Sequence, residues 1–325
     1  MGIAGLFLAA AIAIVVVHAG PAGASSQGKR VALLTTPNQN PYIGAWNAAF
    51  IPTAEKYGMK VTNQTTPYDA AVQSQQVDDA IAQKFDLITV IVANHQAIIP
   101  ALTRAKAAGI PAVIVVSPLD GHEDLFLAYI GTDHGELGRM AGENLAKALT
   151  SGGRKGGNVA AITGFTPQFN THLRMVGFKK AISAYPSVKL VAVEDGKWST
   201  AVSEKIAGQL LVRFAGQGGL DGIYGMADNQ AAGIIQAIEA AGLKLGLAKK
   251  GIVVVGSNCM KEGIQNIRAG KQYSTNTQIP TQEGRAAAEL IAAHFNGKLL
   301  RKWENLPIEA ITPKNVDRYA EACTY

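Results

Sequence analysis

Amide and aromatic side chains gather in the segment TPNQNPYIGAW, residues 36–46. Asn40, Tyr42 and Trp46 stand close together there, directly after the apolar run VALL. An amide carries both a donor and an acceptor, and an aromatic ring has a flat apolar face. The segment is therefore typical of a surface that binds something polar and flat. The structural alternatives are that Asn40 caps a helix, a role compatible with binding, and that Tyr42 packs in the core; for Tyr42 we favour the ligand.

The residue types that catalysis requires do not occur at catalytic spacings. The six histidines show no HExxH or HxH pattern, and neither GxSxG nor the phosphate-binding GxxxxGK[ST] is present. An enzyme needs a nucleophile with its base, paired carboxylates or clustered ligands. We therefore expect no catalysis, no metal site and no cofactor.

The composition is that of a globular protein long enough for two domains. The chain has 325 residues, of which 48% are hydrophobic and 17% charged, with a net charge of +6 and a pI near 9.2. Its lysines and arginines are scattered rather than clustered, which is typical of a solvated surface and not of a nucleic-acid interface. No nucleic-acid partner is expected.

The first 24 residues have the pattern of a cleavable signal peptide. Residues 3–19 are apolar, and Ala22-Gly23-Ala24 fits a small-residue cleavage site before Ser25. The opening MG lacks the usual Lys or Arg, so a retained membrane anchor is the alternative. In an exported protein, Cys259 and Cys323 either form one disulfide or remain free thiols, and the sequence leaves both possibilities open.

Short apolar runs alternate with helical patterns along the whole chain. The predicted strands are VALLTT, DLITVIVA, AVIVVSP, NVAAIT, GIYGMA and IVVVGSN. Such alternation predicts an α/β fold with parallel sheets covered on both faces. About ten strands are too many for one sheet, so we expect two sheets of five or six strands each.

Seven motifs in order carry a resemblance to a known family. They are NQNPYI, GTDHGELGRMAGENL, RMVGFKKAI, GMADNQAAGIIQAIEAAG, VVVGSN, TNTQIPTQEGRAAAELI and ITPKNVDRY. In this order they resemble the type I periplasmic sugar-binding proteins of ABC transporters, the ribose-binding-protein family, over essentially the whole mature chain.

The resemblance implies a fold, a function and partners. Two Rossmann-like lobes, 28–132 plus 279–309 and 133–278 plus 310–325, would be joined by a three-crossing hinge and close on one small ligand. The protein would be a periplasmic monomer that binds a sugar, polyol or sugar derivative and delivers it to an inner-membrane ABC permease. A receptor module that presents the ligand to a chemoreceptor or sensor kinase is the alternative. A repressor core shares this fold but would carry a helix-turn-helix before the first strand, where the signal peptide stands.

The resemblance also suggests which residues bind the ligand. In open α/β sheets ligands lie beyond the carboxyl ends of the strands. Arg174, in RMVGF, would hold hydroxyls or a carboxylate, and Trp198 would stack on the sugar. Asp228, or Asn229 beside it, would contact the ligand or cap a helix. The full candidate set is Asn40, Tyr42, Trp46, Asn94, Ser117, Arg174, Trp198, Asp228, Asn258 and Gln278.

Two departures from the family pattern concern acidic residues. Ser117-Pro118 stands where relatives have an acidic residue and an Arg, and Ser257-Asn258 stands where they have an Asp after VVG. Asn94 and His95 would supply part of what is missing. Fewer carboxylates leave three ligand classes open: a polyol, a modified sugar, or a ligand with its own negative charge.

Overall fold

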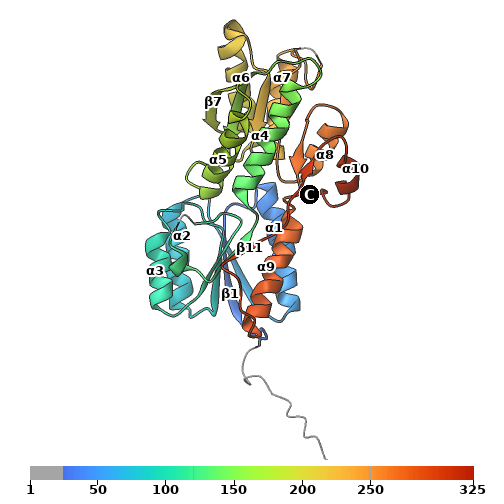
Figure 1. The fold of residues 1–325 in the computed structure, drawn as a ribbon. Helices are drawn as coiled ribbons and strands as arrows, with labels where there is room; N and C mark the ends of the chain where they lie inside the picture. Colours follow the sequence, from blue (N-terminus) through green and yellow to red (C-terminus); the bar gives the residue numbers. More distant parts are fainter. Residues whose placement is uncertain (1–24, 120, 249) are drawn as a thin grey trace, which may run out of the picture.

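The computed structural model describes residues 25–119, 121–248 and 250–325. The predicted signal segment, residues 1–24, lies outside these described residues. Two α/β lobes are stacked end to end, as Figure 1 shows, with α1 and α9 in one lobe and α4 to α7 in the other. Among the described residues, no helix has the length and apolar character to cross a membrane.

The first lobe is built on a six-stranded parallel sheet with the order β11-β5-β4-β3-β1-β2. Its strands are β1 (Arg30–Thr35), β2 (Lys60–Thr65), β3 (Leu87–Val90), β4 (Ala112–Val115), β5 (Ala128–Gly131) and β11 (Trp303–Asn305). Its helices are α1 (Pro41–Lys56), α2 (Ala70–Ala82), α3 (Ile99–Ala107), the 3₁₀ helix η1 (Glu123–Leu125) and α9 (Pro280–Phe295). Apolar cores lie on both faces of the sheet, as parallel strands require.

The second lobe contains a four-stranded parallel sheet with the order β7-β6-β8-β9, fewer strands than expected. Its strands are β6 (Gly157–Thr163), β7 (Val188–Asp195), β8 (Gly222–Gly225) and β9 (Val253–Val255). Its helices are α4 (His134–Thr150), α5 (Phe169–Ser183), α6 (Thr200–Phe214), the 3₁₀ helix η2 (Ala215–Gln217), α7 (Asp228–Ala240), α8 (Lys261–Arg268) and α10 (Val316–Tyr319). All six predicted apolar strands are confirmed.

The chain crosses from one lobe to the other at three places: between β5 and α4, after β10 (Thr275–Asn276), and between β11 and β12 (Ala310–Ile311). Strands β10 and β12 pair antiparallel beside the second lobe. We retain the division into 28–132 plus 279–309 and 133–278 plus 310–325 as a proposal. The carboxyl ends of the sheets face each other across these crossings, so loops from both lobes meet there.

Cys259 and Cys323 form a disulfide, 64 residues apart in the sequence. Both cysteines are buried in a small apolar cluster of α8, β12 and α10. Tyr325, two residues further on, donates its hydroxyl hydrogen to the carbonyl of Asn258. The disulfide therefore fastens the last residues to the loop that follows β9.

Helices α4 and α5 approach closely because two glycines face each other's backbone. A Cβ on Gly138 would lie 1.9 Å from the carbonyl oxygen of Arg174, and one on Gly177 would lie 1.9 Å from that of Gly135. Such positions exclude any side chain unless the two helices separate. The contact fixes the depth at which α5 holds Arg174.

Gly138→Ala should lower the free energy of unfolding by about 1–3 kcal/mol, because the added methyl forces the two helix backbones apart. Gly208→Ala in α6 is the matched control, since a Cβ there meets nothing within 4 Å. The control should be neutral or stabilising by up to about 1 kcal/mol, because alanine favours a helix. Urea denaturation of both variants measures the difference, and equal stabilities would contradict this account of the interface.

Candidate functional site

A cavity of about 330 Å³, counting the space at its opening, lies between the lobes. Seven of its lining residues come from the first lobe: Thr36, Asn40, Tyr42, Ile43, Tyr68, Ile91 and Val116. Six come from the second lobe and its crossing: Gln168, Asn170, Arg174, Trp198, Asn258 and Gln278. Both lobes therefore form the walls of this cavity.

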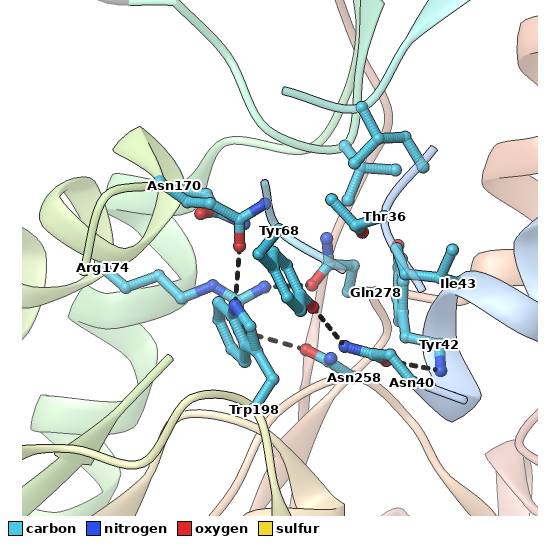
Figure 2. Close-up of a pocket in the computed structure, with 13 residues that line it drawn as sticks. Thr36, Asn40, Tyr42, Ile43, Tyr68, Asn170, Arg174, Trp198, Asn258 and Gln278 are labelled. Carbon is cyan, nitrogen blue, oxygen red and sulfur yellow. Dashed lines mark hydrogen bonds between the residues drawn. The ribbon is translucent and has the colours of Figure 1, made fainter. Parts of the chain in front are cut away.

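Asn40 has two roles at the start of α1. Its Oδ1 accepts a hydrogen bond from the backbone N–H of Tyr42 at 3.0 Å, which caps the helix. Its Nδ2 donates to the Tyr68 hydroxyl at 3.3 Å on the cavity wall, as Figure 2 shows. The helix cap therefore aims the remaining amide group into the cavity.

Arg174 is the centre of the polar side of the cavity, although only 2% of it is exposed. Its Nη1 donates to the carbonyl of Met226 at 2.6 Å and to Asn258 Oδ1 at 3.1 Å. Its Nη2 donates to Oε1 of Gln278. Figure 2 shows the side chains of Arg174, Asn258 and Gln278 pointing toward one another. A planar guanidinium held in this way presents a fixed orientation to a ligand.

His134, at the start of α4, holds the third nitrogen of Arg174. Arg174 Nε donates to His134 Nδ1 at 3.2 Å, and His134 Nε2 donates to the carbonyl of Val116 at 2.6 Å. Burial, with the nearby guanidinium, lowers the pKa of His134 well below its usual value. His134 is therefore neutral at pH 7, with the proton on Nε2.

Trp198 lies on the same wall in the loop before α6, at a φ of +57°. Its Nε1 donates to Gln168 Oε1 at 2.7 Å, and the guanidinium of Arg174 lies 5.4 Å from its ring centroid. A Cβ on Gly164 would lie 2.0 Å from the ring, so the indole packs directly on that glycine. The ring position is fixed by a hydrogen bond at one end and by backbone at the other.

The geometry thus combines a cavity between two lobes, a wall of amides, one guanidinium and several aromatic rings. A family model described as periplasmic binding protein domain matches residues 31–299. The chain belongs to the periplasmic binding protein family.

The similarity to known proteins covers most of this periplasmic binding protein. The xylitol-binding protein of Mycolicibacterium smegmatis is 24% identical over 92% of this chain and 81% of its own length. The crystal structure of a galactofuranose-binding protein has a TM-score of 0.83 at 21% identity, covering 91% of this chain and 98% of that one. The fructose-binding periplasmic domain of a hybrid two-component system has a TM-score of 0.81 at 23% identity, covering 90% and 93%. These structures share the type I fold, which confirms the predicted fold class.

Six of the ten predicted site residues line the cavity of this periplasmic binding protein: Asn40, Tyr42, Arg174, Trp198, Asn258 and Gln278. Trp46 does not, because it lies fully buried in the first-lobe core, stacked on Phe50 at 4.9 Å. Asn94 caps the turn before α3, where its Oδ1 accepts from the N–H groups of Gln96 and Ala97. Ser117 is buried behind its neighbour Val116, which lines the cavity in its place.

Asp228 also lies outside the cavity lining, and neither predicted role fits it. Its carboxylate accepts from Met260 N at 3.0 Å, Thr275 Oγ1 at 2.7 Å and Gln272 Nε2 at 2.7 Å. Burial raises the pKa of this carboxyl to about 7. Asp228 holds the loop after β9 and so positions Asn258. Its neighbour Asn229 donates to the carbonyl of Trp198 at 2.9 Å.

Four polar or aromatic lining residues were missed from the sequence: Thr36, Tyr68, Gln168 and Asn170. Gln168 donates through Nε2 to the first-lobe carbonyl of Val92 at 2.9 Å. Tyr68 packs on Phe165 of the other lobe, with ring centroids 4.9 Å apart. A signal for Gln168 and Asn170 was present in the sequence. The TPQFN segment, shortly before the RMVGF motif, is rich in amide and aromatic side chains.

The two tryptophans should respond differently to substitution. Trp198→Phe removes the hydrogen bond to Gln168 and should weaken ligand binding about three- to tenfold, as expected for one neutral hydrogen bond. Trp46→Phe, the matched core substitution, should lower thermal stability and leave affinity unchanged. Calorimetric titration of both variants with the ligand found in the screen below tests this, and equal losses of affinity would contradict the placement of the cavity.

Proposed function

We propose that this protein is the solute-binding component of an ABC transporter, working in the periplasm. It binds a small sugar, polyol or sugar derivative between its lobes and delivers it to an inner-membrane permease. The observation that carries the proposal is the buried cavity lined by amides, one guanidinium and aromatic rings. Amides and the guanidinium suit hydroxyl groups, and aromatic rings suit the C–H faces of a sugar.

The proposed ligand-binding residues are the six predicted ones that line the cavity, with Tyr68, Gln168 and Asn170 added. No catalytic role is proposed for them, because the cavity lining contains neither a carboxylate nor a nucleophile with its base. Closure follows from the arrangement, since a ligand that contacts both lobes stabilises the closed state.

A thermal-shift screen of the mature protein against pentoses, hexoses, polyols and sugar acids tests the proposal. A ligand bound only by the folded form adds about 2.7 kcal/mol of stability at a hundredfold excess over its dissociation constant. At least one member of the panel should raise the melting temperature by several degrees. No shift with any of them would contradict the proposed ligand class.

The second candidate function is a receptor module for a sensor, favoured by the likeness to the periplasmic domain of a hybrid two-component system. Deleting the gene separates the two roles. Loss of uptake of the labelled ligand supports transport. Normal uptake with a lost transcriptional or chemotactic response supports the receptor.

A further inference from the structure

Glu283 lies behind the cavity wall and not on it. It stands in the first turn of α9, only 1% exposed, and its Oε2 accepts the hydroxyl hydrogen of Tyr42. Its Oε1 has no hydrogen-bond partner of ordinary geometry, and the same holds for the Nε2 of the neighbouring Gln278. Gln278 in turn accepts from Arg174. Two cavity residues, Tyr42 and Gln278, therefore lie between Glu283 and the guanidinium.

The charges at this site are unbalanced without Glu283. Arg174 carries the single formal charge among the lining residues, and its hydrogen-bond partners are neutral: His134, the Met226 carbonyl, Asn258 and Gln278. A guanidinium stays protonated in proteins, so its charge persists when the cavity closes. A buried charge without a counter-charge is costly, and an acidic ligand would supply the missing one.

We propose that Glu283 is the counter-charge of Arg174 and a specificity-determining residue, so that the cavity selects neutral polyhydroxy ligands over the corresponding carboxylates. The proposal rests on the proposed function and names the ligand class within it. An ionised Glu283 brings Arg174 and itself to zero net charge. A carboxylate that binds there loses its hydration, and the neutralised site does not offset that cost with a favourable charge interaction.

The proton on Glu283 sets the pH range of this selection. Burial raises the pKa of Glu283 to about 7, although Tyr42, Gln278 and Arg174 all act to lower it. The other titratable groups around it are Tyr129 on β5 and Tyr325, both with pKa values raised well above the usual tyrosine value by burial. These tyrosines are neutral near pH 7. Asp228 titrates in the same range, but its hydrogen bonds go to Met260, Gln272 and Thr275, which do not line the cavity. Glu283 is therefore the titrating group that is hydrogen-bonded to the cavity wall. Above pH 7 it is ionised and opposes anions, and below pH 7 it becomes neutral and Arg174 is left to attract them.

The test is calorimetric titration with matched probes: xylitol and xylonate, ribose and ribonate, galactose and galactonate. At pH 8 the wild type should bind the neutral member of a pair at least tenfold more tightly than the acid, and this ratio should fall at pH 6. Glu283→Gln should reduce the ratio at pH 8 about tenfold and remove its pH dependence. A merely structural role would weaken both members of a pair together and leave their ratio unchanged.

Glu289→Gln, an exposed position on the same helix, is the matched control and should behave as the wild type. An unchanged ratio in Glu283→Gln would overturn the inference, as would tighter binding of the acid by the wild type at pH 8. Should Glu283→Gln fail to fold, the wild-type pH series decides, because a ratio that is constant from pH 6 to 8 also overturns it. Binding of no probe at all contradicts the proposed function itself, and the inference falls with it.

Discussion

Arg174→Ala should weaken ligand binding by roughly ten- to a hundredfold. The substitution removes a charged donor worth about 1.5–3 kcal/mol to a ligand, and 1.4 kcal/mol corresponds to a tenfold change. It also releases Asn258 and Gln278, which lose the group that orients them. Arg174→Lys should lose most of the affinity as well, because a lysine cannot reproduce the planar fork.

Calorimetric titration measures the loss, and small-angle scattering of ligand-free and ligand-bound protein shows whether closure is lost with it. Arg285→Ala, an exposed position on α9, is the control and should retain full affinity. The Arg174→Ala protein should fold with reduced stability, since four hydrogen bonds are removed. Undiminished affinity in this variant would show that the ligand binds elsewhere.

Removing the disulfide should have the largest effect on stability. Cys259 and Cys323 enclose a loop of 64 residues, for which the chain-entropy model gives about 4 kcal/mol of stabilisation. Replacing both cysteines by serine, or reducing the wild type, should lower the free energy of unfolding by about 2–4 kcal/mol. Guanidinium denaturation with and without reductant measures this effect.

The double serine variant is the internal control for that experiment, because reductant should have no effect on it. Non-reducing peptide mapping of the exported protein should recover one cross-linked peptide pair. Two free thiols in that protein, or a denaturation midpoint insensitive to reductant, would contradict a structural disulfide.

The buried apolar strands were predictable from sequence, including β9 at a sheet edge, whereas the partly exposed edge strands β2 and β7 were not. Strands β1, β3, β4, β6, β8 and β9 are apolar on both faces because helices cover both. Strands β2 and β7 lie at sheet edges and are partly exposed, with sequences such as KVTNQT that lack an apolar run. Their pairing depends on a neighbouring strand, which periodicity within the segment does not reveal.

Six site residues were predictable from the resemblance, but a place at the end of a strand or the start of a helix was not sufficient, because Ser117 and Asp228 have such places and do not line the cavity. Trp46 shares a helix face with Tyr42, but four residues of helix advance about 6 Å, which carries it from the cavity into the core. Asp228 finds its partners 44 and 47 residues later in the chain, at Gln272 and Thr275. No local pattern shows that a carboxylate is already satisfied by such distant groups.

The bonds between the two lobes have a consequence for how fast a ligand leaves. One of these bonds joins Gln168 to the carbonyl of Val92. Two more join His95, through its backbone N–H and its Nδ1, to the carbonyl of Pro167. None of them involves a ligand atom. Each such bond adds to the standing population of the closed form, and apparent affinity scales with that population. The same bonds must break before the ligand can leave, so they lengthen its residence time. Hydrogen bonds that involve no ligand atom therefore favour retention of the ligand and oppose its release to a permease.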